Sequence, residues 1–169
     1  MLNGVRRRIA DMRTIAALCR AAERHALLDQ QREPGAEHFL LAALDLPDGT
    51  ARLAFERAGA DPAGLAPAIR SQYQDALRAV GVGLAMPPAE AVSPAPGAYR
   101  ASASGQELMR ELTAGRSDHA PLLGAHVVAV AAGFRLGVVA RALRAMGADP
   151  AALRTAAEAV TLAGARAAS

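Results

Sequence analysis

The chain has 169 residues, of which 52% are hydrophobic but only 3% aromatic, and its formal net charge is +3. This length and apolar content allow a buried core, and because much of the apolar content is alanine we expect closely packed helices. All of its cationic Lys/Arg positions are arginine, and its single cysteine, Cys19, excludes an internal disulfide and suits a reducing compartment.

Four helices are predicted in the first half of the chain. Apolar residues spaced by three and four positions indicate a first helix, and a polar loop with Pro34-Gly35 separates it from the second. Glu37 falls in the first turn of that second helix, where the helix dipole favours an anion. The predicted helices cover residues 8–28, 36–46, 50–58 and 61–80.

Residues 81–98 are rich in Gly, Pro, Ala and Ser, which predicts an extended linker. Four further helices are expected beyond it, over residues 102–114, 125–132, 137–146 and 149–163. We therefore divide the chain into an N-terminal extension (1–10), a first repeat (11–80), the linker (81–98), a second repeat (99–165) and a tail (166–169).

The pattern Gly-Ala-Asp-Pro occurs twice, beginning at Gly59 and at Gly147. In each copy the glycine suits the left-handed position just past a helix end, and the aspartate, Asp61 or Asp149, can cap the next helix. The two copies are 88 residues apart, and His38 and His126 keep the same spacing. This constant register indicates an internal duplication, in which two copies form a closed pair.

The paired histidines do not predict a metal site. Zinc needs three or four ligands, usually at close spacing, and His38 and His126 have no such neighbours in the sequence. We expect their ring N–H groups to bond nearby backbone carbonyls in a structural role. No metal and no cofactor is predicted.

Two segments carry a resemblance to a known family. Gly35–Leu44, with its Glu37-His38 pair, and Ala51–Asp61, with its helix-Gly-x-Asp junction, resemble the Clp N-terminal domain family. The second copy agrees through His126, Gly147 and Asp149. The resemblance implies an all-α fold of eight helices, in two four-helix repeats related by a pseudo-twofold axis.

In that family the domain receives substrates and adaptor proteins at the front of AAA+ unfoldases, and some members recognise phosphoarginine. Glu37 matches one carboxylate of such a site, whereas Ala125 stands where the second would be. The resemblance places further ligand contacts at Met12, Arg13, Tyr99 and Arg100. The alternative for Glu37 is a structural carboxylate of the first helical turn, and for the other residues an ordinary place in the surface or core.

The sequence also lacks the Gly-x4-Gly-Lys-Ser/Thr phosphate loop of an ATPase, so we expect a free-standing relative of the module. No catalytic constellation is evident, since Cys19 and His25 are more than one helical turn apart. We therefore expect a non-enzymatic protein- or peptide-binding module. It would modulate or shield substrates of a Clp protease, or sequester a ligand of that domain.

The competing hypothesis is a nucleic-acid-binding or regulatory protein that uses Arg6, Arg7 and Arg8. Such binding would weaken steeply with added salt, because phosphate contacts release counterions. We expect no strong duplex binding at physiological salt. Since no stretch approaches the roughly 20 apolar residues of a membrane span, and no secretory signal is evident, we expect a soluble, cytoplasmic protein without a membrane partner.

Overall fold

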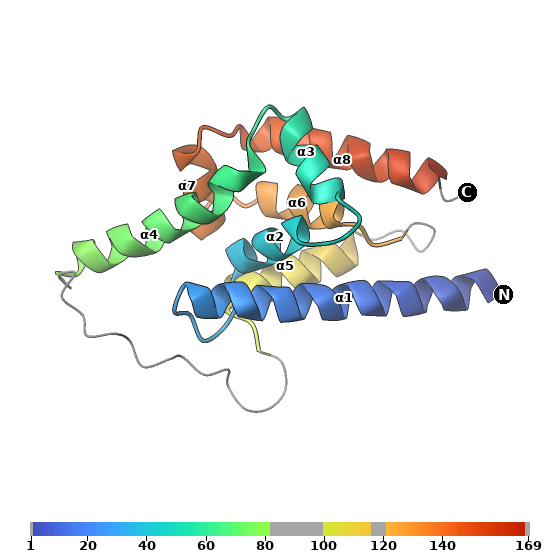
Figure 1. Ribbon diagram of the computed structural model, residues 1–169, viewed down its shortest axis with the longest axis horizontal. Helices are drawn as coiled ribbons and strands as arrows, with labels where there is room; N and C mark the ends of the chain where they lie inside the picture. Colours follow the sequence, from blue (N-terminus) through green and yellow to red (C-terminus); the bar gives the residue numbers. More distant parts are fainter. Residues whose placement is uncertain (1, 82–99, 116–120, 168–169) are drawn as a thin grey trace.

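The computed structural model describes residues 2–81, 100–115 and 121–167, and over these residues it contains α-helices, one 3-10 turn and no strand. Figure 1 shows how the helices are arranged. The elements are α1 (Leu2–Leu28), α2 (Ala36–Leu44), α3 (Thr50–Arg57), η1 (Pro62–Gly64), α4 (Leu65–Ala79), α5 (Ala103–Ala114), α6 (Gly124–Ala132), α7 (Gly137–Ala145) and α8 (Pro150–Ala167). The all-helical class predicted from composition is confirmed for this part of the chain.

Most helix boundaries agree with the predicted ones, and three differ. Helix α1 begins at Leu2, so residues 2–10 continue that helix and do not form a separate extension. Residues 61–64 form a capped 3-10 turn before α4, because Asp61 accepts a hydrogen bond from the Ala63 N–H and Pro62 stands at the first helical position. Helix α8 runs on to Ala167, into the predicted tail. The predicted linker lies almost entirely outside the described residues.

Both Gly-Ala-Asp-Pro junctions have the predicted backbone conformation. Gly59 and Gly147 each have a φ of 72°. The N–H of the following alanine, Ala60 or Ala148, reaches back to a carbonyl in the last turn of the preceding helix, at 3.0 and 2.9 Å. This is the Schellman arrangement, which satisfies helix carbonyls that would otherwise lack partners. Each junction therefore ends one helix and fixes the direction of the next.

The core is built around α2 and α6, which pack against each other at the centre of the molecule (Figure 1). All nine residues of α2 are buried. Helix α1 packs on α2, while α8 packs on α6. Side chains from most of the helices meet in one hydrophobic cluster, and its largest members are Phe39, Phe55, Leu18, Leu40, Leu65, Ile69, Leu108, Leu143 and Leu153.

Contacts between the two halves of the chain are reciprocal. Helix α3 of the first half packs on α8 of the second, and α4 of the first half packs on α7 of the second. Two helix N-termini are also capped across the halves. The Ser104 hydroxyl accepts from the Ala36 N–H at 3.2 Å, and Asp48 Oδ2 accepts from the Gly124 N–H at 3.1 Å. The halves therefore share both apolar core and helix caps.

Hydropathy gives only a weak membrane signal over the described part of the chain. No single helix there combines the length and apolar character of a membrane span, and only α6 and α7 together, bent by 92° at their junction, pass the test as a pair.

Candidate functional site

The structure separates the residues that the resemblance grouped as ligand contacts. Met12 and Arg13 are exposed on α1, and Arg100 is exposed just ahead of α5. Glu37 is buried, with 5% of its surface exposed. Tyr99 lies outside the described residues. The predicted contacts therefore fall into an exposed set and a buried one, which differ in what they can do.

One member of the exposed set belongs to a groove between α1 and α5. Its volume is about 710 Å³, and Arg100 is one of the residues that line it. Met12 precedes Ile15 and Cys19 by three and seven positions, so all three lie on the same side of α1. Below, this feature is called the α1–α5 groove, and it is lined by Ile15, Cys19, Glu33, Arg100, Ala101, Gln106 and Met109.

The chemistry of the α1–α5 groove is apolar at its base and charged at its rim. Ile15 and Met109 are half-buried and pack against the core, whereas Glu33 and Arg100 are exposed. Such a surface can take an apolar side chain of a partner and pair its flanking charges. Sequence reasoning did not single out Ile15 and Met109 as lining residues, although Ile15 lies on the same side of the helix as Met12.

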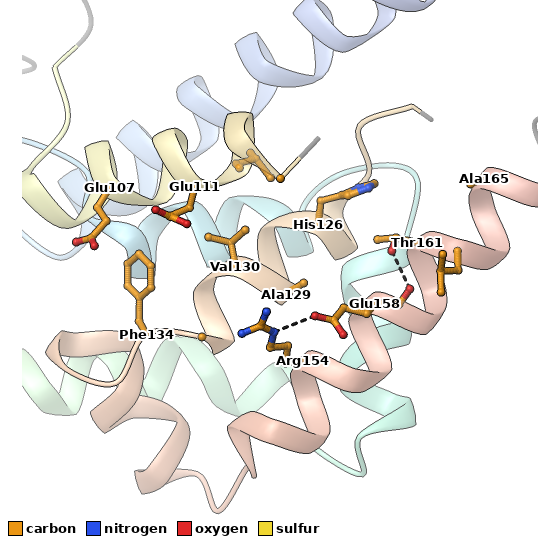
Figure 2. Close-up of a pocket in the computed structure, with 14 residues that line it drawn as sticks. Glu107, Glu111, His126, Ala129, Val130, Phe134, Arg154, Glu158, Thr161 and Ala165 are labelled. Carbon is orange, nitrogen blue, oxygen red and sulfur yellow. Dashed lines mark hydrogen bonds and ion pairs between the residues drawn. The ribbon is translucent and has the colours of Figure 1, made fainter. Parts of the chain in front are cut away.

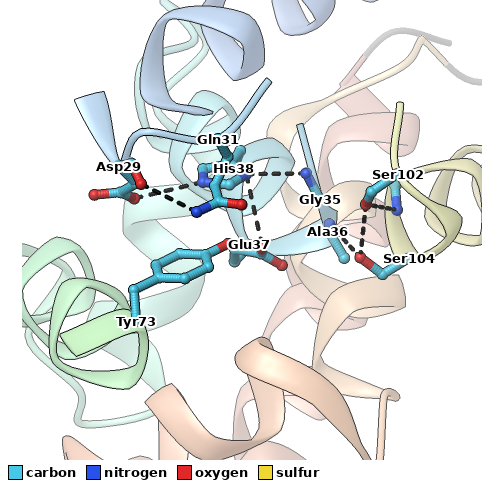
Figure 3. A network of polar contacts seen from close by, with 10 residues as sticks. Asp29, Gln31, Gly35, Ala36, Glu37, His38, Tyr73, Ser102 and Ser104 are labelled. Atoms are coloured by element: carbon cyan, nitrogen blue, oxygen red, sulfur yellow. Dashed lines mark hydrogen bonds and ion pairs between the residues drawn. The ribbon is translucent and has the colours of Figure 1, made fainter. Parts of the chain in front are cut away.

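The buried set forms a polar network around Glu37, which Figure 3 shows. The Tyr73 hydroxyl from α4 donates a hydrogen bond to Glu37 Oε1. Burial, and then the hydrogen bond with this carboxylate, raise the pKa of Tyr73 above its ordinary value. The Glu37 carboxylate also lies over Gly35, where a Cβ atom would stand 2.4 Å from Oε1. The carboxylate is buried and its Oε1 already accepts from Tyr73, so the geometry favours a structural role for Glu37.

His38 completes this network from the next position of α2. Its Nδ1 accepts a hydrogen bond from the Gly35 N–H at 2.9 Å, and its Nε2 lies 3.4 Å from Asp29 Oδ2 (Figure 3). The Tyr73 ring stacks beside the imidazole, with centroids 6.0 Å apart and planes at 9°. His38 therefore caps the N-terminus of α2 through Nδ1, while its Nε2 lies near the Asp29 carboxylate.

His126 makes the equivalent contact at the start of α6, where its Nδ1 accepts from the Leu123 N–H at 3.1 Å. The predicted bonding, in which a ring N–H donates to a backbone carbonyl, is wrong at Nδ1 of both histidines. The reason is that a helix start offers unpaired N–H groups and not carbonyls, so a ring nitrogen there acts as acceptor. Within the described residues, no group of three or more His, Cys, Asp or Glu side chains could hold a metal ion.

Comparison with known proteins adds no family to this picture: no family model matches the chain, and no curated protein is significantly similar to it. Interpretation of the site therefore depends on its own residues and geometry.

Proposed function

We propose that this protein is a protein- or peptide-binding module of the Clp N-terminal domain type. It would bind substrates, adaptors or unfoldase components of a Clp protease, and it would act by binding and carry out no reaction. The observation that carries the proposal is the α1–α5 groove. The groove is lined by Arg100 and lies on the side of α1 that carries Met12, and the family resemblance places ligand contacts at both residues.

The packing of the two halves supports the family assignment. Two four-helix repeats facing each other across a pseudo-twofold axis would pair α3 with α8 and α4 with α7, and both pairs are in contact. The duplicated junctions at Gly59 and Gly147 share one φ of 72° and one hydrogen-bond pattern, as two copies of the same unit would.

The groove favours an extended partner segment with one apolar side chain flanked by charges. Ile15 and Met109 would contact that side chain, while Arg100 and Glu33 would meet an acidic and a basic group on either side. A few buried anchors of this kind carry most of the binding energy of a small interface. The proposal does not include a phosphoarginine site at Glu37, because the Glu37 carboxylate is already bonded to Tyr73.

A reconstituted unfoldase–protease reaction tests the proposal. We expect the purified protein to slow degradation of a substrate recognised through the unfoldase's N-terminal domain, because the added module competes for that substrate by mass action. Met109→Glu places a charge in the groove and should abolish the inhibition.

Leu136→Glu is the matched control, since Leu136 is 86% exposed ahead of α7 and does not line the groove. It should inhibit like the unmodified protein. Degradation that stays unchanged over a wide range of added protein, or that responds equally to both variants, would count against the proposal.

A further inference from the structure

A second cavity lies within the second half of the chain, between α5, α6 and α8 (Figure 2). Its volume is about 660 Å³. Three glutamates and one arginine line it, together with an aromatic ring and an aliphatic floor. We call it the α5–α8 cavity, and the residues used below are Glu107, Glu111, Phe134, Arg154, Glu158 and Thr161.

The charges in the α5–α8 cavity are unbalanced. Arg154 Nε donates to Glu158 Oε1 at 2.9 Å, so this arginine is already paired with one glutamate. Glu107 and Glu111 stand one turn apart on α5, and the Phe134 ring lies beside them in Figure 2. Arg110 is 3.8 Å from Glu107, while the Glu111 carboxylate has no hydrogen-bond or ion-pair partner among the described residues. Among the described residues that line the cavity, glutamates therefore outnumber arginines by three to one, next to an aromatic face.

The first half of the chain shows what fills the corresponding place. Thr161 follows Tyr73 by 88 residues, the same spacing that separates His126 from His38. In the first half, the Tyr73 ring stacks on His38 and bonds a carboxylate. In the second half, the short Thr161 side chain turns back to donate to the Glu158 carbonyl at 2.8 Å, and both Thr161 and His126 line the cavity. The space beside His38 is thus filled by the Tyr73 ring, whereas the equivalent space beside His126 is part of the cavity.

We propose that the α5–α8 cavity binds the guanidinium group of an arginine side chain carried by a partner peptide. A guanidinium is planar and always charged, it donates to carboxylates through a fixed fork of N–H groups, and it stacks on aromatic faces. Glu107 and Glu111 supply the acceptors and Phe134 the face. The excess of carboxylates disfavours anionic groups. This site is separate from the α1–α5 groove and does not depend on the function proposed for it.

Titration by NMR of the whole protein tests the site. The probe is a short Gly/Ser peptide with one central arginine, and the matched probe carries citrulline, which is planar but uncharged. We expect the arginine peptide to shift the backbone amide signals of Gly133, Phe134 and Thr161, with a Kd on the order of 1 mM, typical of a few contacts. The citrulline peptide should leave them unchanged.

Three substitutions distinguish binding in the cavity from a general effect of surface charge. Glu111→Gln should weaken binding of the arginine peptide about twofold to fivefold, the range of a solvent-accessible ion pair. Glu56→Gln removes an exposed glutamate on α3, outside the cavity, and should leave the affinity unchanged. Phe134→Leu should also weaken binding, because it removes the stacking face while keeping an apolar side chain.

Equal shifts with the citrulline peptide, or equal losses in Glu111→Gln and Glu56→Gln, would overturn the proposal. Concentration-dependent self-association that Glu111→Gln abolishes would also overturn it, because a second copy of this arginine-rich chain would then be the occupant. Loss of groove binding in Met109→Glu leaves this result unaffected, so the two sites can fail separately.

Discussion

At the scale of single residues, Glu37 resembles a residue of a binding motif, but its side chain is buried and hydrogen-bonded within the protein. Its place in the first turn of α2 suits an anion electrostatically. The structure adds Tyr73 as a hydrogen-bond donor to this buried carboxylate and places the half-buried Tyr73 ring beside His38. A buried carboxylate needs such partners, because an unpaired charge in the interior is costly. The motif therefore locates a carboxylate, while its surroundings decide whether a ligand can reach it.

The environment of Tyr73 predicts that the stability of the protein depends on pH in the alkaline range. Its pKa is raised in the folded state above the ordinary value of about 10. The stability it contributes is therefore present below about pH 10 and is lost as the pH rises toward the folded-state pKa. We expect the free energy of unfolding to fall above pH 10 by at most about 1.4 kcal/mol per pH unit. In Tyr73→Phe this dependence should be absent.

Urea unfolding followed by circular dichroism between pH 9 and 11 provides the measurement. The chain has no lysine, and its other groups of the types that titrate near this window, Cys19 and Tyr99, are present in both proteins and cancel in the comparison. A decline of equal slope in Tyr73→Phe would show that another group causes it.

At the scale of elements, α5 illustrates how small residues set helix positions. Gly105 of α5 lies so close to the loop before α2 that a Cβ atom there would be 2.4 Å from the Pro34 carbonyl oxygen and 3.2 Å from the Phe39 ring. The Ser102 N–H donates to that same Pro34 carbonyl at 3.1 Å. This close approach brings Arg100 and Met109 beside α1, so it also shapes the α1–α5 groove.

We therefore expect Gly105→Ala to destabilise the protein by about 1–3 kcal/mol, the usual cost of overpacking, despite alanine's higher helix propensity. Gly115→Ala, at the end of the same helix, is the matched control. A Cβ atom there would stand 3.4 Å from the Glu111 carbonyl oxygen, an ordinary contact, and Gly115 has a helical φ of −82°. Thermal unfolding compares the two, and equal melting temperatures would contradict the explanation by close packing.

At the scale of the whole molecule, the two halves depend on each other for helix capping. Asp48, between α2 and α3, accepts hydrogen bonds from the Gly124 N–H and from the Thr50 N–H, at 3.1 and 2.8 Å. Thr50 in turn accepts from the Ala125 N–H at 2.9 Å. One loop of the first half thus caps the central helix of the second.

Asp48→Ala should accordingly weaken both halves together. Loss of the cap leaves a buried N–H of α6 without its acceptor and should cost about 1–2 kcal/mol. Native-state hydrogen exchange measures this, and we expect protection to fall in α3 and in α6 by a similar factor. Asp75→Ala, which removes an exposed aspartate of α4, should leave protection unchanged. Protection that falls in only one half would show that the halves unfold independently.

Much of the local structure could be predicted because its causes are local. Gly59 with Asp61, and Gly147 with Asp149, define helix ends through a left-handed glycine and a side-chain cap, which involve only neighbouring residues. The start of α1 at Leu2 was harder to predict, because the arginines at 6–8 interrupt the apolar pattern without preventing a helix.

The candidate site was only partly accessible to the same reasoning. Glu37 was singled out by its motif, and Arg100 by its place beside the predicted linker. Met109 and Phe134 belong to no motif, and only the tertiary structure places Met109 in the α1–α5 groove and Phe134 in the α5–α8 cavity.

By itself, the sequence determined the helical class, most helix boundaries and the 88-residue repeat, since these depend on periodicity, capping residues and spacing along the chain. Only the tertiary structure decided that Glu37 is bonded to Tyr73, that Asp48 caps α6, and where two cavities remain open. These features depend on contacts between residues far apart in the chain, and whether a space is filled depends on the size of a side chain that arrives from another helix.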